Sequence, residues 1–104
     1  MKRRYFKLQD PWTGKVETVW LKKGAYASND TLAIIVMVAQ DIYSVLTVNI
    51  DVEGATDNMA FVDVNNCTWA EEFIKENGLG DPTGWCGLSG FCTYPLYRFD
   101  LEKF

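Results

Sequence analysis

The sequence contains no histidine, and this absence removes several kinds of catalytic and metal-binding chemistry. A Ser-His-Asp triad, a Cys-His dyad and an imidazole base all need that side chain. Zinc needs four ligands, and the three cysteines include no Cys-x-x-Cys pair, so a three-cysteine site completed by an aspartate is the remaining arrangement. We therefore expect no metal, no cofactor and no enzymatic activity, with catalysis by carboxylates alone as the alternative.

The sequence also lacks a long apolar run. The longest one, residues 32–39, has eight residues, whereas a membrane-spanning helix needs about 20. The basic start, residues 1–4, is followed by polar residues and Pro11 instead of the apolar segment of a signal peptide. We expect a cytoplasmic chain that is not secreted and has no membrane partner.

Cysteines are few and odd in number, which indicates free thiols. Cytoplasmic proteins rarely keep disulfides, so we predict that Cys67, Cys86 and Cys92 are all reduced. Cys86 and Cys92 flank a glycine-rich segment, and they are the one pair that we expect to approach each other closely.

What the sequence does have is the composition of a folded domain. Its 104 residues are 48% hydrophobic and 14% aromatic, which fits a single domain over residues 1–104. The segment 32–39 is continuously apolar and suits a central strand covered on both faces, with a buried helix as the alternative. β-Favouring residues predict strands over residues 4–9, 16–23, 32–39, 43–50, 61–64 and 91–101.

One helix is predicted, over residues 68–77. Thr68 has the spacing of a capping box, and Asn66 is the alternative N-cap. Gly78 is placed to take the left-handed conformation that ends a helix in a Schellman motif, with Leu79 packing against the last turn. The apolar face comprises Trp69, Ala70, Phe73 and Ile74. We therefore predict an α+β fold, a curved antiparallel sheet of about five or six strands packed against this helix.

Charge is distributed unevenly along the chain. Residues 1–24 hold seven basic and two acidic side chains, whereas residues 25–104 hold three basic and twelve acidic ones, and the net charge is −4. A basic amino-terminal hairpin with Tyr5, Phe6 or Trp20 as stacking groups is one arrangement for binding nucleic acid. The alternative is that these strands carry lysines on their solvent-exposed face, where they discourage edge-to-edge aggregation.

Residues 78–90 contain five of the eight glycines. A phosphate-binding loop is excluded, because this segment leaves a predicted helix, enters a predicted strand and contains no lysine. We predict an irregular, Ω-like loop that acts as a binding element. Trp85 and Leu88, with help from Tyr94, are predicted to form its contact surface, because large apolar anchors dominate interface energies. The alternative is that Trp85 folds back onto the sheet as a lid on the core.

A resemblance to a known family rests mainly on the second half of the chain. Residues 46–49 also fit, and the first forty residues match only in general character. The residues that carry it are Ala60-Phe61-Val62-Asp63, Asn65-Asn66, Trp69-Ala70-Glu71-Glu72-Phe73-Ile74, Glu76-Asn77-Gly78-Leu79-Gly80, Pro82-Thr83-Gly84, Ser89-Gly90-Phe91-Cys92-Thr93-Tyr94-Pro95 and Tyr97 to Leu101. They resemble a family of small uncharacterised bacterial proteins, classed as a domain of unknown function, that is associated with plasmids and conjugative elements of gut anaerobes.

The resemblance implies a mobile-element accessory protein and carries no catalytic residues to transfer. Together with the long structured loop, it leads us to expect a non-enzymatic interaction module that binds a host or element protein. Nucleic-acid binding through the basic amino-terminal hairpin is the alternative function, and the acidic remainder of the chain argues against it.

Overall fold

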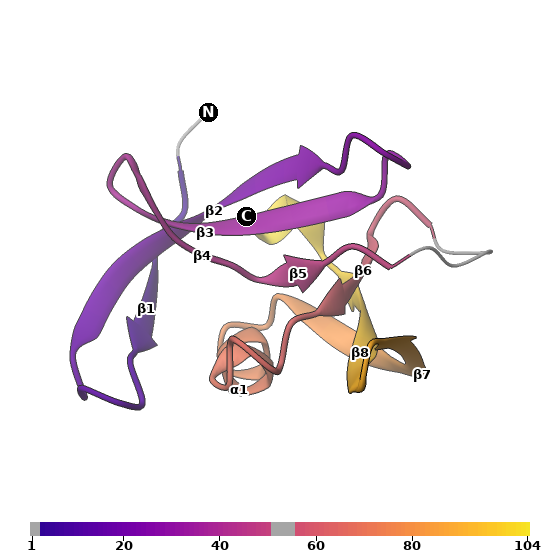
Figure 1. Cartoon of the computed structure of the whole chain (residues 1–104). Coiled ribbons are helices and arrows are strands. Elements are labelled where there is room, and N and C mark those ends of the chain that lie inside the picture. Colours follow the sequence, from indigo (N-terminus) through magenta and orange to yellow (C-terminus); the bar gives the residue numbers. More distant parts are fainter. Residues whose placement is uncertain (1–2, 51–55) are drawn as a thin grey trace.

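The computed structural model describes residues 3–50 and 56–104, and the strands in these ranges form two four-stranded antiparallel sheets (Figure 1). The first sheet has the order β1-β2-β3-β4 and the second the order β5-β6-β8-β7. The first sheet comprises β1 Phe6–Gln9, β2 Val16–Ala25, β3 Leu32–Val38 and β4 Asp41–Val45. The second comprises β5 Thr47–Val48, β6 Met59–Val62, β7 Gly80–Ser89 and β8 Cys92–Phe99. The predicted antiparallel pairing and single α-helix are confirmed for the described residues, whereas the predicted single sheet of five or six strands is wrong.

The first sheet is a meander of hairpins. Asp10 closes the β1–β2 turn, because its carboxylate accepts hydrogen bonds from the backbone N–H groups of Trp12 and Thr13, at 2.8 and 3.2 Å. These bonds lower the pKa of Asp10. The continuously apolar segment forms β3 between β2 and β4, so the prediction of a central strand is confirmed and the helical alternative is wrong. The predicted cover on both faces is found on one face only, since the main core packs against one side of this sheet.

The chain passes from the first sheet to the second at Leu46. The sequence alternates through this region as if one strand ran over residues 43–50, but β4 ends at Val45 and β5 begins at Thr47. The Leu46 N–H donates to the Ile34 carbonyl at 2.9 Å, and the Thr47 hydroxyl oxygen accepts from the Ile34 N–H at 3.1 Å. Backbone groups of β3 thus hold the crossing segment, which is why one predicted strand becomes two.

The helix α1 spans Ala70–Glu76 and begins without a side-chain cap. Its N-cap residue is Trp69, so the predicted capping roles of Thr68 and Asn66 are wrong. Asn66 is instead bonded to the preceding turn, where its backbone and side-chain N–H groups both donate to the Asp63 carboxylate. Asn66 therefore forms a local Asx-type turn with Asp63 instead of capping the helix.

The end of α1 follows the predicted Schellman motif. Gly78 has φ +61°, and its N–H donates to the Lys75 carbonyl at 3.2 Å. The Leu79 N–H donates to the Ile74 carbonyl at 3.0 Å, and both side chains are fully buried. No helix in the described ranges combines the length and the apolar character that crossing a membrane requires.

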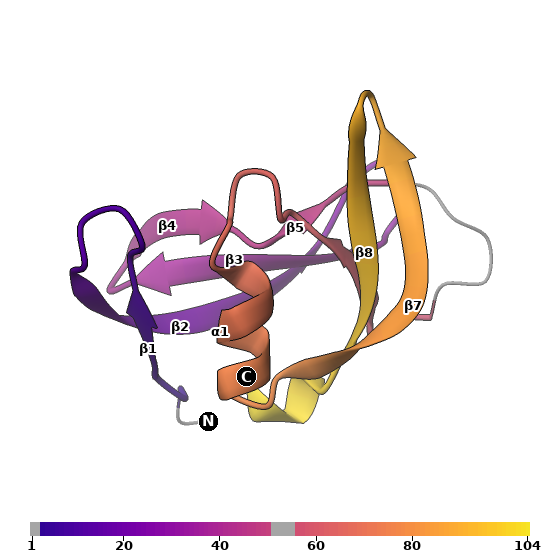
Figure 2. The same ribbon diagram turned by 90° about the horizontal axis from the view of Figure 1, so that it is seen from below.

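The main hydrophobic core joins both sheets and the helix. Figure 2 shows α1 lying between the first sheet and the β7–β8 hairpin. The buried residues of α1, Ala70, Phe73 and Ile74, belong to the core. Phe73 contacts Phe6 and Trp69 with ring centroids 6.3 and 5.7 Å apart, in edge-to-face geometry. The short helix η1, Leu101–Lys103, follows β8. A second, smaller core cluster comprises Phe61, Tyr94 and Leu96 with their half-buried neighbours.

Candidate functional site

The glycine-rich segment is a strand, which corrects the prediction of an Ω-like loop over residues 78–90. It forms β7, which pairs antiparallel with β8, and the pairing shifts register between Pro82 and Cys86. Gly84, with φ +91°, lies in this irregular stretch, and Gly90, with φ +63°, lies in the tight turn that joins the two strands. The glycines therefore bend and close a hairpin.

The outer part of this hairpin, residues 83–95, is here called the hairpin arm. Pairing between β8 and β6 ends at Leu96, so the β8 residues before it pair with β7 alone. Figure 2 shows the tip of the β7–β8 ribbon projecting beyond the rest of the fold. Pro95 pairs with Cys86 next to the register shift, and a proline, which has no N–H to donate, is tolerated in a strand at such an irregularity.

The hairpin arm presents large apolar side chains to solvent. Trp85 and Leu88 are each 74% exposed, and Phe91 at the tip is fully exposed. From Pro82 to Tyr97 no residue is charged. The exposure of Trp85 shows that the lid alternative is wrong. Large exposed apolar groups on an ordered element are typical of surfaces that bind other molecules.

Tyr94 does not share the surface predicted for it. It lies opposite Gly87 in the hairpin register and is buried in the smaller core cluster with Phe61. A Cβ at Gly87 would lie 2.7 Å from the Phe61 ring, so the missing side chain makes room for this packing. Leu88, the next residue along β7, points to the opposite face. The candidate contact surface is therefore Trp85 and Leu88 with Phe91 in place of Tyr94; sequence reasoning assigned Phe91 to a strand, although the Ser-Gly turn signal before it marks a hairpin tip.

The three cysteines are free and lie apart from one another. Cys67 is buried, its sulfur is 3.0 Å from the Ser44 hydroxyl, and burial raises the pKa of its thiol. The expected approach of Cys86 and Cys92 is wrong, because Cys92 pairs with Ser89, three strand positions, or about 10 Å, from Cys86. A disulfide needs Cα atoms within about 7 Å. Within residues 3–50 and 56–104, no group of three or more Cys, Asp or Glu side chains is placed to hold a metal ion.

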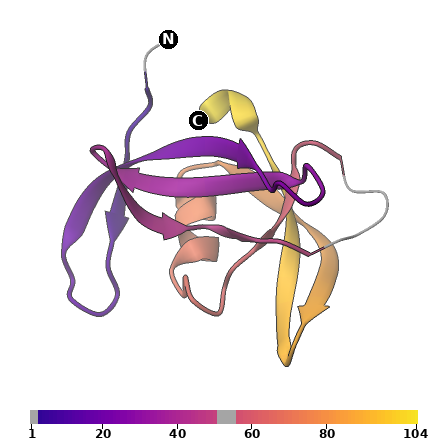
Figure 3. The same cartoon turned by 45° about the horizontal axis from the view of Figure 1, so that its top comes forward.

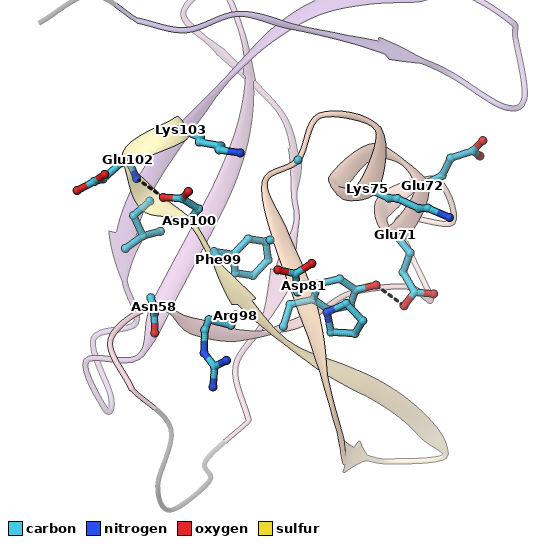
Figure 4. Close-up of a pocket in the computed structure, with 15 residues that line it drawn as sticks. Asn58, Glu71, Glu72, Lys75, Asp81, Arg98, Phe99, Asp100, Glu102 and Lys103 are labelled. Atoms are coloured by element: carbon cyan, nitrogen blue, oxygen red, sulfur yellow. Dashed lines mark hydrogen bonds between the residues drawn. The ribbon is translucent and has the colours of Figure 1, made fainter.

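A groove of about 1190 Å³ lies beside α1 and the starts of β7 and η1 (Figure 4). Both signs of charge line it: Glu71, Glu72, Asp81, Asp100 and Glu102 against Lys75, Arg98 and Lys103. The Tyr97 hydroxyl donates to the Glu71 carboxylate at 2.7 Å, and this bond ties β8 to α1. Asp100 accepts from the Glu102 N–H and caps η1. Glu71, Tyr97 and Asp100 of the groove lining are thus engaged in hydrogen bonds within the fold.

Tyr97 makes the stability of the fold sensitive to high pH. Burial, together with the hydrogen bond to Glu71, raises the pKa of Tyr97 far above its ordinary value of about 10. The protonated form is therefore favoured in the folded state, and its contribution is complete below about pH 10 and lost as the pH rises toward the folded pKa. We expect the Tyr97→Phe variant to lose less stability than the wild type between pH 9 and pH 11, each relative to its own value at pH 8, in urea unfolding. Equal losses in the two proteins would contradict this account.

A family comparison covers both the hairpin arm and the groove. The domain of unknown function DUF4313 matches residues 20–104. The chain belongs to the DUF4313 family. The match extends further toward the amino terminus than the resemblance in sequence had indicated, and it leaves β1 and the first part of β2 outside. No curated protein and no solved structure matches the chain.

The basic amino-terminal hairpin of this DUF4313 chain is less available than its composition indicates. Lys15 forms an ion pair with Glu17 at 3.2 Å, and the Arg3 guanidinium lies 3.8 Å from the centre of the Trp20 ring. Of the three predicted stacking groups, Phe6 packs against the main core, whereas Tyr5 is exposed. Nucleic-acid binding through this hairpin stays a prediction.

Proposed function

We propose that this DUF4313 chain is a non-enzymatic protein-interaction module whose contact element is the hairpin arm. The observation that carries the proposal is the exposure of Trp85, Leu88 and Phe91 on an ordered ribbon that has no charged residue. Aromatic and large aliphatic anchors of this kind supply most of the binding energy in protein interfaces. An apolar cleft of a partner protein fits the arm, because no charge on the arm would have to be desolvated.

The root of the hairpin arm is held in place before any partner arrives. The Thr83 hydroxyl donates to the Leu96 carbonyl at 2.9 Å, and its oxygen accepts from the Trp85 N–H at 3.2 Å. Packing of Tyr94 against Phe61 anchors the inner face of the ribbon. Because the backbone around Trp85 is already ordered, binding loses little conformational entropy there.

The partner is, in this proposal, a host protein or a protein encoded by a mobile element. The support is the sequence resemblance over residues 60–101 to small bacterial proteins associated with plasmids and conjugative elements. An accessory role in such an element fits a small module that binds without catalysing a reaction.

The proposal predicts a specific result for the Trp85→Ala variant. Its free energy of unfolding should stay within about 0.5 kcal/mol of the wild type, because the side chain is exposed. The same variant should lose the partner that the immobilised wild-type chain retains from a lysate of the source bacterium. Urea unfolding and quantitative mass spectrometry of the retained proteins measure the two effects.

The matched control is Trp12→Ala. Trp12 is exposed in the β1–β2 turn, outside the family match, so its loss should change neither stability nor partner retention. Retention by Trp85→Ala and by Leu88→Ala that equals that of the wild type would refute the proposal. A loss of about 3–5 kcal/mol in Trp85→Ala would show instead that the tryptophan supports the core.

A further inference from the structure

The first sheet has one face that no second sheet and no α-helix of the described residues covers. Figure 3 shows β2, β3 and β4 in front of α1 and the second sheet, so that this face is turned toward the viewer. We call it the outer face. The strand register places two rows of side chains across its centre: Trp20, Met37 and Ile42 in one row, and Lys22, Ile35 and Val45 in the other.

The charged side chains of the first sheet are unevenly distributed between its two faces. Lys7 and Lys22 lie on the outer face by register, and the Arg3 guanidinium stacks on Trp20. The nearby acidic residues lie on the other side: Glu17 is opposite the buried Leu8, and Asp41 is opposite Val38. The charged residues that the register places on the outer face are therefore all cationic, although the chain has a net charge of −4.

The apolar part of the outer face is at its most exposed on the edge strand β4. Ile42 is 65% exposed and Val45 is 40% exposed, whereas Met37 beside them is buried. The cations lie over β1 and β2, and the exposed aliphatic side chains lie over β4, about 10 Å away across β3. That separation matches the width of an α-helix, which is about 10–12 Å with its side chains.

We propose that the outer face binds an amphipathic, acidic segment of another protein. Its apolar stripe would contact Ile35, Ile42 and Val45, and its carboxylates would face Lys22 and Arg3. Charge complementarity carries this choice of partner, because among the described residues the strand register places cations and no carboxylate on this face. The proposal concerns a different surface from the hairpin arm and does not depend on the function proposed for that arm.

The same observations disfavour two other occupants. Single-stranded nucleic acid needs several exposed aromatic faces on which bases stack, whereas the exposed apolar groups of β4 on this face are the aliphatic Ile42 and Val45. Arg3 covers Trp20 on one side, and the indole N–H of Trp20 donates to the Ala39 carbonyl at 2.7 Å. A second copy packed with its β1 and β2 facing those of the first would bring like charges together.

Selection from a random peptide library tests the proposal without a known partner. Peptides displayed on phage are selected on the immobilised full-length chain, and the enriched peptides are synthesised with a fluorescent label. We expect them to combine several acidic residues with an apolar stripe, and to bind more weakly as salt concentration rises. Fluorescence anisotropy gives their affinities, and a labelled thymidine oligonucleotide serves as the nucleic-acid probe.

Two adjacent lysines provide the matched variants. Lys22 lies on the outer face, and Lys23, the next residue of β2, lies opposite the buried Ile34 on the other face. We expect Lys22→Glu to weaken peptide binding by about tenfold or more and Lys23→Glu by less than about twofold. Ile42→Thr should weaken it by a similar factor of about ten, because it removes apolar contact at an exposed position. Urea unfolding checks that each variant is folded.

Several results would overturn the proposal. These are enrichment of no peptide, enrichment without acidic residues, and equal effects of Lys22→Glu and Lys23→Glu. If the chain binds the oligonucleotide and Lys22→Glu abolishes that binding, the face is assigned to nucleic acid. If the chain self-associates in sedimentation and Lys22→Glu abolishes the association, the face is assigned to a second copy. If Lys22→Glu fails to fold, Ile42→Thr still decides, because unchanged peptide affinity in that variant contradicts the proposal.

Discussion

Replacing Phe99 by alanine is expected to lower the free energy of unfolding by about 3–5 kcal/mol. Phe99 is 2% exposed and is the largest of the fully buried side chains in the described ranges. Its ring lies 6.1 Å from that of Tyr97 and 6.3 Å from that of Phe104, between β8 and the carboxyl-terminal helix η1. The substitution deletes a buried aromatic ring, so its packing contacts are lost and a cavity is left in the core. Because domains of this size are stable by about 5–15 kcal/mol, the variant should be largely unfolded at modest urea concentrations.

The control for Phe99→Ala is the same substitution eight residues earlier. Phe91 is fully exposed at the tip of the hairpin arm, so Phe91→Ala should change the free energy of unfolding by no more than about 0.5 kcal/mol. Urea unfolding of both variants, followed by circular dichroism, measures the difference. Similar losses in the two variants would mean that the arm packs against the fold.

Replacing Gly80 by alanine is the second change with a large expected effect, a loss of about 1–3 kcal/mol. A Cβ at this position would lie 2.5 Å from the Arg98 carbonyl oxygen and 3.1 Å from the Phe99 Cα. Both are backbone atoms of the paired strand β8, so neither can move without disturbing the β7–β8 pairing. The added methyl group therefore forces the two strands apart at the start of β7.

Gly24→Ala is the matched control for Gly80→Ala, because Gly24 also lies within a strand and has no positive φ. There the nearest atom to an added Cβ is the Ala33 Cβ at 4.0 Å, which is ordinary contact. We expect Gly24→Ala to leave stability unchanged or to raise it by about 0.4–1 kcal/mol. Thermal unfolding of the two variants compares them directly, and a stable Gly80→Ala would show that β8 tolerates displacement here.

A structural feature was predictable from the sequence where the residues that form it lie close together in the chain. The end of α1 is an example, because Gly78, Leu79 and Ile74 supply its hydrogen bonds and its apolar contact within six residues. The strand β3 was predictable as well, since a short continuous apolar run is typical of a strand in the middle of a sheet. The start of α1 was not predictable. The Asn66 side chain can either cap the helix or bond to the preceding turn, and in the structure it bonds to Asp63.

The candidate site was predictable only in part. The sequence pointed to Trp85 and Leu88 because glycines surround large apolar groups, and both are exposed on the hairpin arm. It gave no signal that Tyr94 is buried, because that depends on Phe61, a residue from β6. Gly87 carried a misleading signal, since a glycine that is typical of a loop serves here to admit the Phe61 ring.

The sequence by itself determined the antiparallel strands, the one α-helix with its glycine end, the absence of histidine chemistry and the exclusion of a phosphate-binding loop. The tertiary structure alone decided that the strands divide into two sheets at Leu46 and that the glycine-rich segment is a strand. It also decided which face of β2 is turned away from the core, so that Lys22 lies on the outer face and Lys23 lies opposite the buried Ile34. The physical reason is the same in each case: local pattern sets the conformation and alternation of a segment, whereas its face, neighbours and exposure depend on residues that are distant in sequence.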